Sequence, residues 1–78
     1  MKRRAIFFHA GCPVCLDAES KLAEAIDSSR YDVEHVHLGE SPDRLAEAER
    51  LGVQSVPAVV IDNAPFHINF GAALADLR

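Results

Sequence analysis

Hydrophobic and polar residues alternate along this chain with two periodicities, one typical of strands and one typical of helices. Apolar side chains run almost without interruption over Arg4–His9 and again over Val56–Ile61, the pattern of strands buried on both faces of a sheet. Imperfect alternation over Tyr31–Leu38 and regular alternation over Pro65–Phe70 predict two further strands with unlike faces. The pattern therefore predicts four strands.

Helix signals occupy two of the gaps between these strands. After an Ala-Gly turn, a helix begins near Cys12, carries apolar residues at intervals of three and four, and is ended by Ser28-Ser29. A second helix begins at Ser41, because serine is a favoured N-cap and Pro42 suits the first helical position. Gly52 is a good C-terminal cap for that helix.

The end of the chain completes the order of elements. Asp62-Asn63 is a short turn, so the last two strands form an antiparallel hairpin. Gly71 then opens a short helix over Ala72–Leu77. The order is β-α-β-α-β-β-α in a single domain over residues 1–78. The two βαβ units predict parallel pairs and the hairpin an antiparallel edge, giving a four-stranded mixed sheet with helices packed on it.

Composition and charge narrow the classes of function. A hydrophobic share of 49% is enough for one core and argues against disorder. The formal net charge of −4 opposes nucleic-acid binding, which needs a basic surface. The apolar stretch after the basic cluster Lys2-Arg3-Arg4 is broken at His9, so it is too short for a signal peptide or a membrane span. We therefore expect a cytoplasmic protein with no nucleic-acid or membrane partner.

The candidate chemistry lies in Cys12-Pro13-Val14-Cys15, which holds the only two cysteines. At a helix start, the Cys12 sulfur can accept the amide hydrogens of Val14 and Cys15, while Pro13 has no N–H to offer. The helix dipole adds roughly 0.3–1 kcal/mol, or about one pKa unit at most, so the amides must supply any larger shift. Cys15, one turn further in, can resolve a mixed disulfide formed at Cys12. This arrangement in a β-α-β context predicts thiol–disulfide exchange.

Two other interpretations of the cysteine pair stay open. A Cys-x-x-Cys is half of a zinc site, but no second cysteine pair exists and the spacing of His9, His35, His37 and His67 matches no zinc-finger pattern. The pair could also be inert and buried. We predict no metal, and we expect His9 to be a surface residue at a strand end.

Two separated motifs resemble the thioredoxin fold, most closely its glutaredoxin-like branch. The stretch Ile6–Cys15 is similar to the strand-turn-helix that carries the Cys-Pro-Tyr-Cys motif of glutaredoxins. Far downstream, Ser55-Val56-Pro57 before an apolar strand is similar to the Thr-Val-Pro loop of the same fold. The resemblance covers nearly the whole chain and implies a thioredoxin-like, three-layer α/β/α fold.

The resemblance also implies roles for individual residues. Cys12 would be the nucleophile and Cys15 the resolving thiol, and the two would form the redox-active disulfide. Pro57 would follow a cis peptide bond and face these thiols. The backbone of Val56 would pair with an extended segment of the substrate.

The chain departs from the family at several positions. Glutaredoxins follow the last strand with a Gly-Gly turn and an acidic residue near the glutathione amine, whereas Phe70-Gly71-Ala72-Ala73 keeps one glycine and no charge. Val14 replaces the central tyrosine of the motif. Thioredoxins carry a buried acid at the position of Ile6 and a tryptophan at that of Gly11. These departures weaken a glutathione-binding assignment and favour a protein substrate.

We therefore predict a protein-disulfide oxidoreductase that reduces protein disulfides through a Cys12 mixed disulfide resolved by Cys15. It needs an electron donor and binds no cofactor beyond its own redox-active disulfide. The predicted substrate-binding residues are Gly11, Pro13, Val14, Val56, Pro57 and Gly71. The alternative is a metal-binding or redox-sensing module that uses the same pair without turnover.

The last strand and the last helix bear on assembly. Pro65 suits an edge strand, because proline cannot donate a hydrogen bond to a neighbouring strand. The final helix is short and covers one face of the sheet poorly. An open edge and incomplete cover make a homodimer one expected state.

Overall fold

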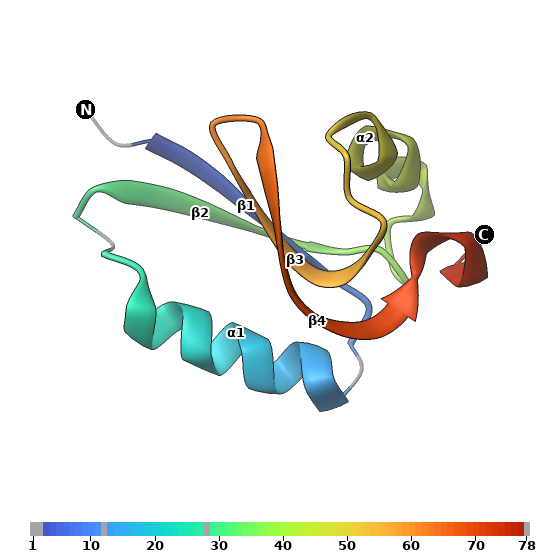
Figure 1. The fold of residues 1–78 in the computed structure, drawn as a ribbon, viewed down its shortest axis with the longest axis horizontal. Coiled ribbons are helices and arrows are strands. Elements are labelled where there is room, and N and C mark those ends of the chain that lie inside the picture. Colours follow the sequence, from blue (N-terminus) through green and yellow to red (C-terminus); the bar gives the residue numbers. More distant parts are fainter. Residues whose placement is uncertain (1–2, 12, 28, 78) are drawn as a thin grey trace.

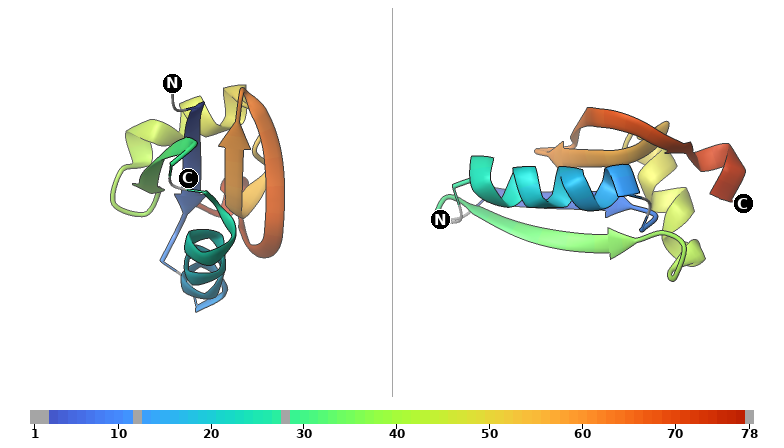
Figure 2. Two further views of the ribbon diagram at one scale, coloured as in Figure 1. Left: turned by 90° about the vertical axis from the view of Figure 1, so that its left-hand side faces the viewer. Right: turned by 90° about the horizontal axis from the view of Figure 1, so that it is seen from below.

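The structure is a computed structural model, and it describes residues 3–11, 13–27 and 29–77. A four-stranded sheet lies between α1 (Pro13–Ala25) on one side and α2 (Leu45–Arg50) on the other (Figure 1). Two contacts fix the sides. Glu19 of α1 approaches His35, whereas Arg44, just before α2, bonds to Glu34 on the opposite face of the same strand. The predicted three-layer α/β/α fold with a mixed sheet is confirmed (Figure 2).

The sheet has the strand order β2-β1-β3-β4. Its strands are β1 (Arg3–His9), β2 (Tyr31–His37), β3 (Ser55–Ile61) and β4 (Ala64–Ala73). The two central strands are those predicted from uninterrupted apolar runs, and Ala5–His9 and Ser55–Val60 are buried throughout. Central strands are covered on both faces, so their sequences need apolar residues at successive positions.

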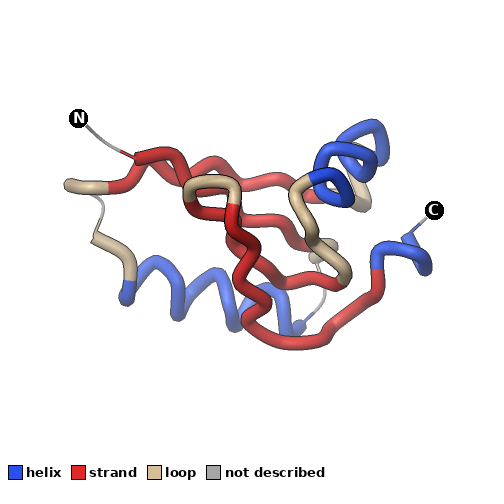
Figure 3. Tube along the Cα trace, turned by 45° about the horizontal axis from the view of Figure 1, so that its top comes forward, coloured by secondary structure: helices blue, strands red, loops and turns tan. Residues whose placement is uncertain are grey.

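One predicted strand direction is wrong. β1 and β2 are parallel, but β3 runs antiparallel to β1, so the second βαβ unit does not give a parallel pair. The connection from β2 to β3 is a 3₁₀ turn, η1 (Pro42–Arg44), followed by the six-residue α2. Six helical residues span roughly 9 Å and a seven-residue strand roughly 23 Å, so α2 is too short to carry the chain back along the sheet. The chain re-enters from the same end (Figure 3).

The second helix begins and ends near the predicted residues, but its start is not formed by the predicted serine cap. The Ser41 side chain makes no capping hydrogen bond, and η1 forms instead, with the Leu45 N–H donating to the carbonyl of Pro42. At the other end, Gly52 has φ +89° and donates its N–H to the Glu49 carbonyl at 3.0 Å. Glycine adopts this left-handed conformation without steric cost, which explains the stop.

The last strand is longer than predicted, and the last helix is shorter. Ala72 and Ala73 pair with Val56 and Ser55, so they extend β4 instead of opening a helix. Only η2 (Leu74–Leu77), a 3₁₀ turn, follows. Between the two paired stretches, Pro57 alone lies opposite residues 68–71, which form a bulge in β4.

Most residues of the core lie on the α2 side of the sheet, and Cys15 joins them from the first turn of α1. Its buried residues are Ile6, Phe8, Cys15, Val36, Leu38, Leu45, Ala48, Val53, Val56, Ala58, Val60 and Leu74. On the α1 side, Ala5 and Phe7 are fully buried. Among the helices of residues 3–77 that the structure describes, none has the length and apolar character to cross a membrane.

Candidate functional site

In the sequence, the Cys-Pro-Val-Cys motif spans the junction between β1 and α1. Cys12 lies outside the described residues, and with it the predicted Cys12–Cys15 disulfide. Cys15 lies in the first turn of α1 and is fully buried. It belongs to the same core cluster as Phe8 and Val56. The prediction that Cys15 faces the body of the domain is therefore confirmed.

The Val56–Pro57 peptide bond is cis, as the family resemblance implied. Both residues are fully buried in β3. Val56 and Cys15 belong to one buried cluster although 41 positions separate them in the sequence, so one residue of each motif packs into the same core. Because the Val56 side chain is buried, the predicted contact with a substrate would have to be made by the backbone of this residue.

The turn before Cys12 is held by a histidine. Gly11 has φ +75° and donates its N–H to Nδ1 of His9 at 3.2 Å. His9 is buried, so the expectation of a surface histidine is wrong. Its ring stacks on Phe7, with the centroids 5.4 Å apart.

A second histidine stands against this turn. His37 is the register partner of His9 across the parallel β1–β2 pair, and the two ring centroids lie 4.8 Å apart. Nδ1 of His37 accepts the Gly39 N–H at 3.1 Å. A Cβ on Gly11 would meet Nε2 of His37 at 2.6 Å. Since both Nδ1 atoms accept hydrogen bonds, the proton of each neutral ring lies on Nε2.

The pKa of His9 is lowered from its ordinary value, first by burial and then by the neighbouring His37. The charges of Glu19 and Glu40 raise this pKa, and His35 lowers it further. The net direction favours an uncharged ring beside the turn. Sequence inspection missed the role of His37; its signal is the register, since parallel strands that end in His9 and His37 bring these residues side by side.

The remaining predicted binding residues fall into two groups. Gly11 and Pro13 are exposed and Val14 is half-buried, all at the start of α1. Gly71 is exposed and lies in the bulge of β4 that faces Pro57. Figure 2 shows β4 curving beside α1, which brings the chain segments of both groups to the same region of the molecule.

The four histidines do not gather into one site. His9, His35 and His37 lie on the α1 side of the sheet, linked through Phe7, whose ring meets His35 edge-on at 5.8 Å. His67 is instead tied to the chain after α2, where its Nε2 accepts the Gln54 N–H at 3.1 Å. Among the residues that the structure describes, no group of three or more His, Cys, Asp or Glu side chains is arranged to hold a metal ion.

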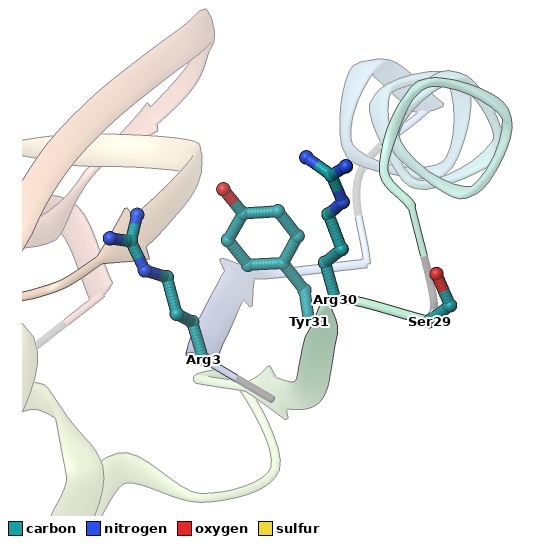
Figure 4. Close-up of a pocket in the computed structure, with 4 residues that line it drawn as sticks. All are labelled: Arg3, Ser29, Arg30 and Tyr31. Carbon is teal, nitrogen blue, oxygen red and sulfur yellow. The ribbon is translucent and has the colours of Figure 1, made fainter. Parts of the chain in front are cut away.

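A polar hollow of about 450 Å³ lies far from the cysteine motif, at the opposite end of β1 and β2. Arg3, Ser29, Arg30 and Tyr31 line it, and in Figure 4 the two arginine side chains stand on either side of the tyrosine ring. Arg3 also pairs with Asp62 at 3.3 Å. Among the described residues that line the hollow there is no cysteine, histidine or carboxylate.

Comparison with known proteins connects the geometry with a family. No family model matches the chain, and no curated protein sequence does. A solved structure does: the solution NMR structure of the dimeric thioredoxin-like protein NE0084 from Nitrosomonas europea is 62% identical in sequence, with a TM-score of 0.91. The match covers 99% of this chain and 96% of that one. At this identity over nearly the whole length, the chain belongs to the thioredoxin-like family.

Proposed function

We propose that this protein is a thiol–disulfide oxidoreductase that reduces disulfides in other proteins. The observation that carries the proposal is the burial of Cys15 in one cluster with Val56, immediately before the cis bond to Pro57. A buried thiol in the first turn of α1 is suited to resolving a mixed disulfide that forms at the first cysteine of the motif.

The reaction has two exchange steps. The Cys12 thiolate attacks one sulfur of the substrate disulfide, which forms a mixed disulfide and releases the other sulfur as a thiolate. The Cys15 thiolate then attacks Sγ of Cys12, and the second substrate sulfur leaves with its electron pair. Two electrons have passed to the substrate, and the protein holds a Cys12–Cys15 disulfide. A dithiol electron donor restores the reduced form through the same steps in reverse.

Substrate binding rests on an apolar rim with few charges. The exposed Pro13, the half-buried Val14 and the exposed Gly11 and Gly71 leave room for an extended chain, and the backbone of Val56 can pair with it. Such a surface suits a protein segment better than a small charged molecule. No cofactor is needed, since the cysteine pair is itself the redox group.

Two further parts of the proposal concern location and assembly. We place the protein in the cytoplasm, where a donor can keep such a pair reduced. The solved relative is dimeric, and this chain shares 62% of its sequence, so we propose a homodimer here as well.

Cysteine variants test the mechanism. Cys12→Ser should abolish insulin reduction in the presence of dithiothreitol, and Cys15→Ser should accumulate a covalent complex with the substrate that reductant dissolves. Circular dichroism of both variants controls for folding. Activity of Cys12→Ser above the uncatalysed rate would overturn the mechanism. Tight stoichiometric zinc binding by the reduced protein, without disulfide exchange, would favour the metal-binding module instead.

A further inference from the structure

The edge strand β4 exposes two large apolar side chains. Phe66 is 53% exposed and Ile68, two positions further on, is 41% exposed. Phe66 pairs with Val59, which in turn pairs with Phe7, so Phe66 lies on the face of the sheet that carries α1. We call the surface of Phe66 and Ile68 the β4 patch.

The arrangement of the helices leaves this patch uncovered. A helix with its side chains is about 10 Å wide and strands are about 4.8 Å apart, so one helix covers about two strands. Only α1 lies on this face among the described helices, and Figure 2 shows it beneath the middle of the sheet with β4 at its flank. The short η2 does not help, because Leu74 packs into the core with Leu45 and Ala48 on the other side.

The β4 patch is better suited to packing of side chains than to pairing with another strand. Pro65 has no N–H to donate to a further strand, and the bulge at residues 68–71 breaks the regular spacing of the edge. Both features hinder the addition of another strand by main-chain hydrogen bonds. An exposed aromatic next to an exposed aliphatic side chain is instead typical of the centre of a protein interface.

We propose that a second copy of this chain docks on the β4 patch, so that Phe66 and Ile68 of both copies meet across a two-fold axis. This inference rests on the proposed homodimer, for which the dimeric relative is the support. A stable interface buries roughly 800 Å² per partner, about a sixth of the 4824 Å² surface of this chain. Two side chains do not supply that area, so further surface around β4 belongs to the interface too.

The test compares the patch with an equally exposed apolar residue elsewhere. Leu16 on α1 is 57% exposed and serves as the matched control. The full chain, Phe66→Glu, Ile68→Glu and Leu16→Glu are studied by equilibrium sedimentation. We expect the unchanged chain and Leu16→Glu to be dimers with similar dissociation constants, and each patch variant to dissociate at least tenfold more readily. Phe66→Ala, which adds no charge, should show a smaller shift in the same direction.

Each outcome bears on a separate claim. If the patch variants dimerise as tightly as the unchanged chain, or if Leu16→Glu weakens the dimer as much as they do, the interface lies elsewhere. If the unchanged chain is monomeric at high concentration, the homodimer and this inference both fail. Insulin reduction by the same samples reports on the cysteine chemistry independently, and thermal unfolding confirms that each variant folds.

Discussion

His37 packs its imidazole against Gly11, so closely that a Cβ on residue 11 would lie 2.6 Å from Nε2. The glycine also has φ +75°, a conformation that costs other residues about 1–2 kcal/mol. His37 of β2 therefore lies against the turn that leads to Cys12, and any residue other than glycine is strained at position 11. The proposed chemistry begins one residue later.

Gly11→Ala should lower the free energy of unfolding by about 2–3 kcal/mol, because the cost of a left-handed alanine adds to the clash with His37. Urea unfolding of the two proteins measures the difference. The same substitution in a chain that also carries His37→Ala separates the two causes. There Gly11→Ala should cost only about 1–2 kcal/mol, since only the cost of the left-handed conformation remains. An equal loss in both backgrounds would mean that the ring does not confine residue 11.

The burial of His9 predicts a pH dependence of stability near neutrality. Its pKa is lowered in the folded protein by burial and by His37, so the unfolded chain binds the proton more tightly. Stability is then fully present above the ordinary histidine value of about 6.5 and falls as the pH drops from there through the folded value. Protonation would also remove the Nδ1 acceptor of the Gly11 N–H.

Urea unfolding between pH 5 and 8 tests this expectation. The unchanged chain should lose stability toward the acidic end of that range, and His9→Asn should lose less, because asparagine does not titrate. His67→Gln is the control, since His67 is exposed and bonded to Gln54 instead of to the turn. The carboxyl groups of Glu34 and Glu47, whose pKa values are lowered by hydrogen bonds from Arg44, act below this range. A pH profile of His9→Asn that follows the unchanged chain would assign the effect to another group.

Arg44 joins the segment before α2 to the sheet. It donates two hydrogen bonds to Glu47, at 2.7 and 2.9 Å, and a third to Glu34 at 2.9 Å. Arg4 of β1 donates to the other oxygen of Glu34 at 2.6 Å. Arg44 thus links η1 with α2 and β2, and Glu34 extends the network to β1 through Arg4. Arg44, Glu34 and Glu47 are all half-buried.

Arg44→Gln should lower the free energy of unfolding by about 1 kcal/mol, because a bidentate network exceeds an isolated surface pair. Arg44→Lys should recover little of it, since an ammonium group cannot make the forked contact. Lys21→Gln breaks the exposed pair with Asp17 and should cost about 0.3–0.5 kcal/mol or less. Guanidinium chloride is a salt and would screen these ion pairs, so unfolding is measured in urea. Similar losses at Arg44 and Lys21 would show that the network adds nothing.

The sequence predicted those parts of the fold that depend on one element at a time. The uninterrupted apolar runs of β1 and β3 placed both strands in the middle of the sheet, and helical spacing turned Cys15 inward. The cis bond before Pro57 came from the family resemblance and has no signature in the residues themselves. What escaped prediction depends on two elements at once. The direction of β3 follows from how little of the sheet α2 spans, and the burial of His9 follows from its register with His37.

The end of the chain illustrates the same limit. Ala72 and Ala73 favour a helix by propensity, yet they pair with β3 because the strand continues beyond the bulge. This pairing brings Leu74 over the core, where it is buried and its N–H donates to the Gln54 carbonyl at 3.0 Å. Tertiary packing thus overrides the local preference, and Leu74 becomes the anchor of the C-terminal turn.

Leu74→Ala should therefore lower the free energy of unfolding by about 2–4 kcal/mol, the cost of removing a buried leucine and leaving a cavity. Leu16→Ala provides the matched control, since its exposed side chain should cost about 0.5 kcal/mol or less. Leu77→Ala, half-buried at the end of η2, should fall between them. Urea unfolding gives the three values, and a slope that stays constant shows that the unfolded states are comparable. If Leu74→Ala lowered the free energy of unfolding no more than Leu16→Ala does, burial of Leu74 would not explain why residues 72–73 stay in the sheet.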